Sequence, residues 1–183
     1  MDQGLIPRRY AKALLMLASE HQSAPAVYEA MIRLADSFAA EPQLRHTLSN
    51  PAISNEEKLS LVLAASGAQG VAAEELSGYV KLLCQNRRLD SLYQSALAFI
   101  ALYRAQNHIF KVNVTSAAPL SAEEMGRIKS IVERQLPADS TADFSEAVNP
   151  DLIGGFTVSI DNELLDASVA NELKQLRIKL LSH

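Results

Sequence analysis

The segment VNPDLIGGFTVSIDNELLDASV, residues 148–169, constrains the fold of this chain more than any other stretch. Asn149 and Pro150 indicate a turn, because the proline ring fixes φ and biases the preceding residue away from helix. Gly154 and Gly155 allow a positive φ or a close approach to neighbouring backbone. The segment carries no nucleophile, metal-ligand set or phosphate-binding loop, so we predict a structural role for it.

The later part of this segment predicts a strand, a chain reversal and a helix start. Apolar and polar residues alternate over 156–160, which is typical of a half-buried strand. Asp161 and Asn162 are suited to reverse the chain, and Asp166 or Ser168 is suited to cap a following helix. The residues that we treat as a structural signature are Asn149, Pro150, Gly154, Gly155, Asp166 and Ser168.

Side chains that commonly carry chemistry are scattered along the chain. The four histidines have no neighbouring ligands in the sequence; they are His21, His46, His108 and His183. Cys84 lies among apolar residues, which favours a buried helix thiol over a nucleophile. The glycine pair at 154–155 lacks the third glycine and the Lys-Ser/Thr ending of a phosphate-binding loop. We therefore expect no catalytic residue, no metal and no cofactor, and a function that depends on apolar grooves between helices.

Composition restricts the possible partners and compartments. The net charge is −4, and residues 1–105 contribute nothing to it, with ten basic and ten acidic side chains; residues 106–183 carry seven against eleven. This balance counts against binding to duplex nucleic acid. A single cysteine excludes an internal disulfide and suits a reducing compartment. We find no apolar run of the roughly 20 residues that a membrane span needs, and we expect no export or transit signal.

Residues 1–105 predict a compact bundle of six short amphipathic helices. Apolar residues recur three and four positions apart, and proline or glycine separates the helical stretches. Ser54 and Glu57 form a capping-box pattern at the start of the fourth helix, where each side chain satisfies a free backbone N–H.

Residues 106–183 predict a small α+β domain. Alternation over 110–114 indicates a strand, and Ser121 with Glu124 marks a capped helix. A weaker strand pattern around 144–148 precedes the signature hairpin, and a last helix follows. The predicted fold is therefore mainly α, with an N-terminal six-helix bundle followed by a small α+β C-terminal domain.

Four motifs together resemble one family, the delta subunit of rotary ATP synthases, also called the oligomycin-sensitivity-conferring protein. Residues 148–156 are similar to its V-D-P-x-L-I-G-G-F motif, with Asn149 where the family often has Asp, and residues 166–169 resemble its D-x-S-V. Residues 10–14, YAKAL, resemble the family's opening. Residues 86–89, NRRL, resemble its mid-chain N-x-R-L, and residues 116–121 resemble the segment that joins its two halves.

The resemblance implies a non-catalytic stator subunit of a proton- or sodium-translocating rotary ATP synthase. The protein would clamp the catalytic head to the peripheral stalk, so that rotor torque drives ATP synthesis. It would bind at the cytoplasmic face of the bacterial inner membrane without inserting, and it would not form a homo-oligomer.

The resemblance also implies where the partners bind. Residues 1–105 would dock an amphipathic helix from the N-terminus of the α subunit between the first and fifth helices. The matching residues are Tyr10, Ala13, Leu14, Leu17, Tyr79, Leu82 and Leu83. The alternative is that these residues form internal bundle core, and we expect this for about half of them because one helix cannot give its whole apolar stripe to a partner.

Residues 106–183 would hold the b subunits of the stalk. The candidates repeat with the heptad rhythm of a helix seam; they are Val169, Leu173, Leu176 and Leu180. These four residues could instead cover the small sheet.

A rival hypothesis from another class is a small helical RNA-binding factor. Such a protein would use the double-basic sites as phosphate contacts and would bind with a steep salt dependence. The residues concerned are Arg8, Arg9, Arg87 and Arg88. The neutral N-terminal region and the acidic C-terminal region speak against this hypothesis.

Overall fold

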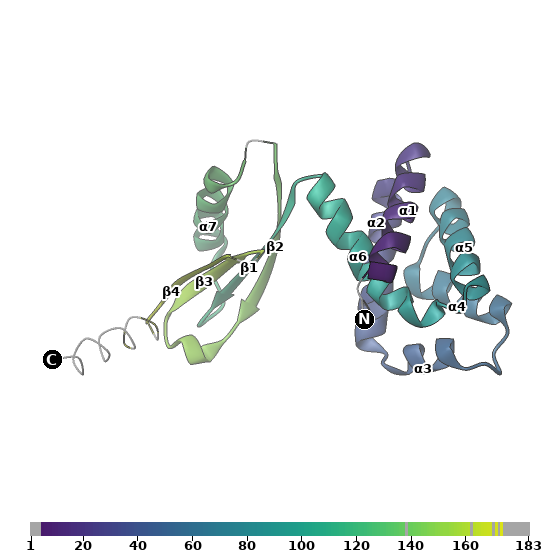
Figure 1. The fold of residues 1–183 in the computed structure, drawn as a ribbon. Coiled ribbons are helices and arrows are strands. Elements are labelled where there is room, and N and C mark those ends of the chain that lie inside the picture. Colours follow the sequence, from purple (N-terminus) through teal and green to yellow (C-terminus); the bar gives the residue numbers. More distant parts are fainter. Residues whose placement is uncertain (1–4, 138, 162, 170, 172, 174–183) are drawn as a thin grey trace. The chain divides into compact units, whose positions relative to one another are not determined.

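The computed structural model describes residues 5–137, 139–161, 163–169, 171 and 173. The chain divides into two compact units, Met1–Gln106 and Asn107–His183 (Figure 1). The first unit is helical and the second contains a small sheet, which confirms the predicted mainly α fold with an α+β C-terminal part.

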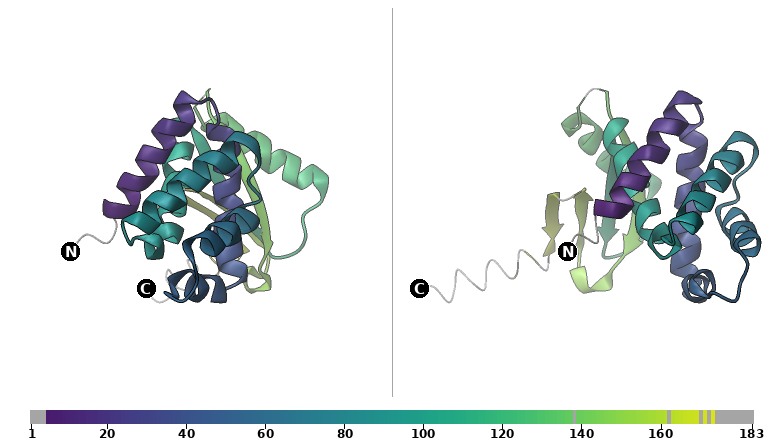
Figure 2. Two further views of the ribbon diagram at one scale, coloured as in Figure 1. Left: turned by 90° about the vertical axis from the view of Figure 1, so that its right-hand side faces the viewer. Right: turned by 45° about the vertical axis from the view of Figure 1, so that its right-hand side comes forward.

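Six α-helices build the first unit. They are α1 (Leu5–Glu20), α2 (Ala24–Ala40), α3 (Gln43–Ser49), α4 (Asn55–Ser66), α5 (Gly70–Gln85) and α6 (Leu92–Gln106). A short 3-10 turn, Leu89–Ser91, precedes α6. Helix α6 packs against both α1 and α2 (Figure 2), and α1 also contacts α5.

Local chemistry fixes the ends of α4. The Ser54 hydroxyl accepts from the Glu57 backbone N–H at 3.2 Å, and the Glu57 carboxylate accepts from the Ser54 N–H at 2.9 Å, so the predicted capping box is present. Gly67 ends the helix with φ +56°, a left-handed conformation in which glycine carries no steric penalty. The core of the first unit contains large, fully buried apolar side chains from α2, α5 and α6. They include Met31, Leu34, Leu76, Leu83 and Phe99.

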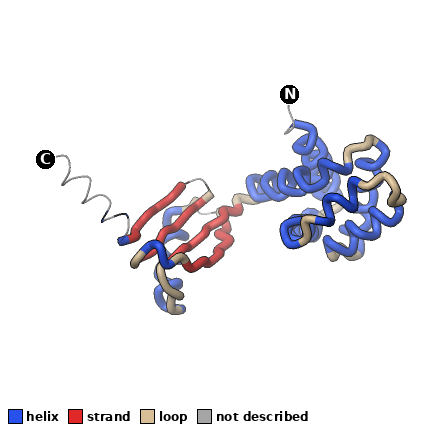
Figure 3. Tube along the Cα trace, turned by 90° about the horizontal axis from the view of Figure 1, so that it is seen from below, coloured by secondary structure: helices blue, strands red, loops and turns tan. Residues whose placement is uncertain are grey.

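One sheet and one helix build the second unit. The elements are β1 (Ile109–Ser116), α7 (Ala122–Gln135), β2 (Thr141–Val148), β3 (Gly155–Ile160) and β4 (Glu163–Ser168). The strand order is β2-β1-β3-β4, with β1 and β2 parallel and the other pairs antiparallel. Helix α7 connects the parallel pair and lies against one face of the sheet (Figure 3).

Alternation along the strands determines which side chains meet α7. Val112, Val114 and Val158 are buried with Met125 and Ile128 of the helix. Ser121 and Glu124 form the second predicted capping box at the start of α7. Among the described residues, α7 covers one face of this four-stranded sheet and supplies apolar contacts that stabilise it.

The signature segment folds as a turn, a strand pair and a cap. The Asn149 side chain accepts from the Asp151 N–H at 3.0 Å, which closes the predicted turn. Gly155 has φ +75°, and a Cβ added there would overlap the carbonyl oxygen of Ala167 on β4. The Ser168 hydroxyl accepts from the Asn171 N–H at 3.2 Å, so Ser168 caps the chain that follows.

Ile153 adopts a backbone conformation that the sequence did not signal. Its φ is +64° and its ψ is −39°, and the Gly154 N–H donates to the Leu152 carbonyl at 2.7 Å. This three-residue γ-turn is strained, above all for a β-branched residue. The Ile153 side chain is nevertheless 67% exposed.

Candidate functional site: an apolar groove between α1 and α5

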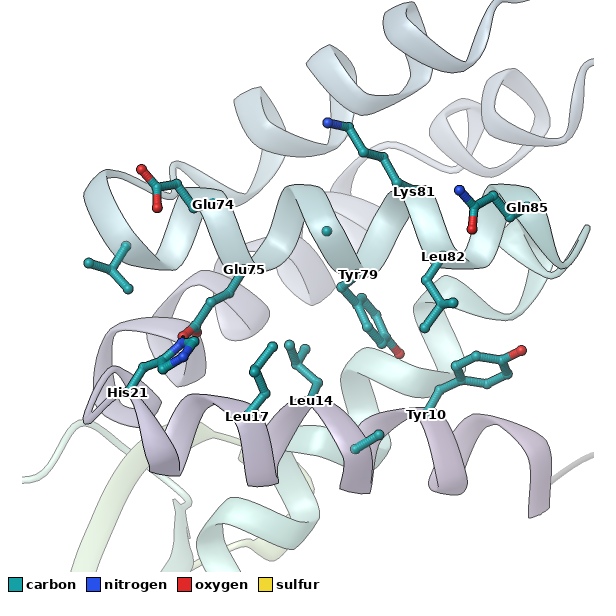
Figure 4. A pocket seen from close by; sticks show the side chains of 13 residues that line it. Tyr10, Leu14, Leu17, His21, Glu74, Glu75, Tyr79, Lys81, Leu82 and Gln85 are labelled. Carbon is teal, nitrogen blue, oxygen red and sulfur yellow. Dashed lines mark hydrogen bonds and ion pairs between the residues drawn. The ribbon is translucent and has the colours of Figure 1, made fainter.

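A groove of about 640 Å³ runs between α1 and α5 (Figure 4). The residues that line it are Tyr10, Ala13, Leu14, Leu17, His21, Val71, Glu74, Glu75, Gly78, Tyr79, Lys81, Leu82 and Gln85. Six of the seven residues predicted for the first partner site are among them. The two helices therefore bring together side chains that lie more than 50 residues apart in the sequence, since Leu17 and Val71 both line the groove.

The groove exists because each helix buries only part of its apolar stripe. Leu14 is 2% exposed and Tyr79 is 6% exposed, so both form the floor and also pack into the bundle. Leu17 and Leu82 remain 40% and 43% exposed at the sides. Ala13 and Gly78 have little or no side chain to fill the space between the helices. A further helix, from another protein, therefore has room to approach α1 and α5 closely.

Leu83 does not line the groove, in contrast to its assignment as a partner contact. Its side chain has 0% exposure and lies in the bundle core. One helical residue corresponds to a rotation of about 100°, so the step from Leu82 to Leu83 turns the side chain from the groove into the interior.

The Tyr79 hydroxyl is buried without a hydrogen-bond partner among the described residues. Burial raises the pKa of Tyr79 to about 12, and the nearby Ser95 hydroxyl opposes this rise without reaching hydrogen-bonding geometry. The ring thus supplies a large rigid surface to the groove floor, at the cost of an unpaired polar atom.

A buried carboxylate closes one end of the groove. Glu75 is 6% exposed, and its two oxygens contact His21 Nδ1 at 2.8 Å and the Ser23 hydroxyl at 2.6 Å. The Ser23 hydroxyl also lies 3.2 Å from the Ala18 carbonyl oxygen. These contacts join the end of α1 to the start of α5, and they satisfy a charge that would otherwise be costly to bury.

A second hollow of about 450 Å³ continues the groove at its opposite end. It shares Tyr10, Ala13 and Leu82 with the groove and adds Ile6, Arg9 and Arg88. Sequence reasoning assigned these two arginines to a rival RNA-binding hypothesis. The turn after α5 brings Arg88 to the same hollow as Arg9, an arrangement for which the sequence has no local signal.

No group of three potential metal-binding side chains occurs within the described part of the chain. Burial raises the pKa of the Cys84 thiol while Lys58 opposes that rise, so the thiolate that a nucleophile requires is disfavoured. Among these same residues, no helix is both long and apolar enough to cross a membrane.

The predicted stalk site is only partly described. Val169 and Leu173 are 38% and 51% exposed, whereas Leu176 and Leu180 lie outside the described residues. Strand β4 adds two exposed apolar side chains that the sequence pattern did not single out, Leu164 at 67% and Leu165 at 54%. They occur next to each other and point to opposite faces of the sheet, so alternation gave no signal for them.

Known proteins similar to this chain agree on one family. The sequence profile described as ATP synthase delta (OSCP) subunit matches residues 6–180. ATP synthase subunit delta of Phocaeicola vulgatus is 38% identical over 179 residues, which cover 98% of this chain and 95% of that protein. The corresponding protein of Streptococcus pyogenes serotype M1 is 31% identical and covers 98% and 97% of the two chains.

A solved structure shares the fold. A chain in the cryo-EM structure of the Toxoplasma gondii mitochondrial ATP synthase hexamer aligns with a TM-score of 0.68 and 23% identity. The alignment covers 96% of this chain and 97% of that one. The shared fold therefore extends over both units.

Proposed function

Because the chain belongs to the ATP synthase delta (OSCP) subunit family, we propose that it is a non-catalytic stator subunit that holds the catalytic head to the peripheral stalk. A rotor that turns against the head produces ATP only if the head is prevented from turning with it. The subunit resists that torque by binding the head through one unit and the stalk through the other. This role is the same whether the complex translocates protons or sodium ions.

The head-binding site is the groove between α1 and α5, and its occupant is the amphipathic N-terminal helix of an α subunit. The single observation that carries this proposal is the groove itself, an apolar channel lined by Ala13, Leu17 and Leu82 and floored by Tyr79. A helix that inserts its apolar face buries the exposed apolar side chains of Ala13, Leu17 and Leu82, and removing this apolar surface from water favours binding. Small residues beside a tyrosine anchor favour close packing at the centre of the contact.

The stalk-binding site lies on the second unit, and its occupants are the b subunits. Four exposed apolar side chains among the described residues support this assignment: Leu164, Leu165, Val169 and Leu173. Two binding units on one chain raise the effective concentration of the second partner, so the joint attachment exceeds the affinity of either contact. The subunit then lies at the cytoplasmic face of a bacterial membrane, as a peripheral protein. It does not form a homo-oligomer.

Substitution of Ala13 by Trp tests the groove. The indole fills the space between α1 and α5, so the affinity for a peptide of the α-subunit N-terminal helix should fall about tenfold or more, which corresponds to ~1.4 kcal/mol. Isothermal titration calorimetry with the full chain measures the affinity, and circular dichroism checks that the variant is folded.

The matched control is Met16→Trp. Met16 lies on the same helix, is 65% exposed and does not line the groove. An Ala13→Trp variant that is folded and binds the peptide as well as Met16→Trp and the unmodified chain would refute the assignment of the groove.

A further inference from the structure

The two ends of the groove carry side chains of opposite charge. Glu74 and Glu75 line one end, and Arg9 with Arg88 lines the hollow that continues the other end. Figure 4 shows the two carboxylates on the side of His21, and Tyr10 with Leu82 at the far side. Along the channel, the charge thus changes from negative to positive.

The side chains, and not the backbone, produce this polarity. Helices α1 and α5 are antiparallel, since the end of α1 contacts the start of α5 through His21 and Glu75, while Tyr10 meets Leu82 at the other end. Each end of the groove therefore combines the positive dipole end of one helix with the negative end of the other, and the two contributions oppose each other.

Some of the charged side chains at the two ends already have hydrogen-bond partners in the part of the chain that the structure describes, and others do not. Glu75 is occupied by Ser23 and His21, whereas Glu74 is exposed and makes no hydrogen bond or ion pair within the described residues. Arg9 and Arg88 are exposed, and neither forms an ion pair in the described part of the chain. The remaining cation that lines the groove, Lys81, lies on α5 between the two ends (Figure 4).

We propose that these charges set the direction of the docked helix, with its N-terminal end against Glu74 and its C-terminal end against Arg9 and Arg88. The helix then lies parallel to α5 and antiparallel to α1. Its unpaired N–H groups, with their partial positive charge, meet a carboxylate, and its last carbonyl groups meet two guanidinium groups. This inference rests on the proposed function, because it concerns the helix that occupies the same groove.

The chemistry of the matching partner follows from the same arrangement. Basic side chains in its first turn suit Glu74, and acidic side chains in its last turn suit Arg9 and Arg88. A charge that interacts with a helix end changes affinity by about two- to fivefold at low salt, and salt screens the effect. Three such charges are sufficient to favour one direction over the other.

Paramagnetic relaxation in NMR tests the direction with the full chain. A peptide of the α-subunit N-terminal helix carries a nitroxide at its first residue in one sample and at its last residue in another. The first label should broaden the amide signals of His21 and Glu74, and the second those of Arg9 and Arg88. The opposite pattern would overturn the proposed direction while leaving the groove as a binding site. A peptide that does not bind at all would contradict the proposed function instead.

Charge reversal tests the cause of the direction. Glu74→Lys and Arg88→Glu should each lower the peptide affinity two- to fivefold at low salt, and the loss should disappear at high salt. Arg87→Glu is the control, because Arg87 is adjacent in sequence and exposed but lines neither the groove nor the hollow. In the double variant Glu74→Lys with Arg88→Glu, the relaxation pattern should reverse or become equal at both ends. An unchanged pattern would show that these charges do not set the direction.

Discussion

Gly155 shows how a single residue controls the second unit. Its positive φ and the close approach of the Ala167 carbonyl leave no room for a side chain at the point where β3 begins. The sequence predicted that the glycine pair would need such freedom, but not which glycine needs it. Gly154 has no positive φ, and a Cβ added there would meet the Val169 side chain at 3.0 Å and not the backbone. The distinction depends on tertiary contacts with β4, which no local pattern encodes.

Gly155→Ala should destabilise the second unit by about 2–4 kcal/mol, because a left-handed conformation and a backbone overlap both oppose the added methyl group. Gly126→Ala is the control. Gly126 lies in α7 with nothing within 4 Å of an added Cβ, so this substitution should stabilise the unit by about 0.5–1 kcal/mol. Chemical denaturation measures both. Equal effects of the two substitutions would contradict the assigned role of Gly155.

Tyr79→Phe should leave the first unit as stable as before, or more stable by up to ~1 kcal/mol at neutral pH, because it removes an unpaired buried hydroxyl. The pKa of Tyr79 is about 12 against 10.0 for the exposed group. Because the pKa of Tyr79 is higher in the folded chain than in the unfolded chain, the unfolded chain loses its proton first as the pH rises. The corresponding contribution to the free energy of unfolding is complete below pH 10 and is lost as the pH rises through 12. It amounts to roughly 3 kcal/mol.

Thermal denaturation between pH 8 and pH 12 should therefore show a smaller alkaline loss for Tyr79→Phe than for the unmodified chain. Tyr103, whose pKa burial also raises, remains in both proteins and serves as an internal reference. Identical alkaline profiles would show that the pKa of Tyr79 is the same in the folded and unfolded chain, and would contradict the burial of its hydroxyl group.

At the scale of elements, local chemistry made the helices predictable. The capping boxes at Ser54 and Ser121 identify the starts of α4 and α7, and apolar spacing identifies the remaining helices. Two features were not predictable. The choice of Leu82 over Leu83 as a groove residue depends on the rotation of α5 against α1. The γ-turn at Ile153 lies between β2 and β3, which both pair with β1, so it depends on how the sheet is assembled.

Ser54→Ala should lower the stability of the first unit by about 1 kcal/mol, because the N–H of Glu57 loses its acceptor. Ser60→Ala is the control, since Ser60 lies in the same helix, is exposed and occupies no capping position. Equilibrium unfolding in urea compares the two. A loss of the same size in both variants would exclude a capping contribution.

The capping boxes also predict a dependence on acid. Hydrogen bonds from Ser54 and Ser121 hold the pKa values of Glu57 and Glu124 below their ordinary value of 4.5. A lowered pKa stabilises the fold above the unfolded value, and this stabilisation is lost as the pH falls through the folded one. Ser54→Ala should therefore reduce the slope of stability between about pH 5 and pH 3. An unchanged slope would argue against the capping contact.

At the scale of the whole molecule, the chain is two units with separate cores, and we propose that each binds its own partner. Sequence patterns located the change of character near residue 106, because helical spacing gives way to alternation there. Six of the seven residues predicted for the first partner site also line the groove, because the two helices present apolar stripes. The charge polarity of the groove was not predictable, since Arg9 and Arg88 line one hollow only in the folded chain.

A chain that ends at Gln106 should fold alone and bind the α-subunit peptide with the affinity of the full chain, because the groove and its supporting core lie within the first unit. Calorimetric unfolding and peptide titration measure both properties. A truncated chain without a cooperative transition would contradict the independence of the units.

Cross-linking inside the assembled ATP synthase is the most direct measurement of the central claim, that the groove holds the head. The chain has one native cysteine, Cys84, so Cys84→Ser gives a background for single cysteines at Ala13 or Met16. With a cysteine in the α-subunit N-terminal helix, Ala13→Cys should form an adduct with α and Met16→Cys should form little. Complexes that contain the chain but yield no adduct from Ala13→Cys, or more from Met16→Cys, would contradict the claim.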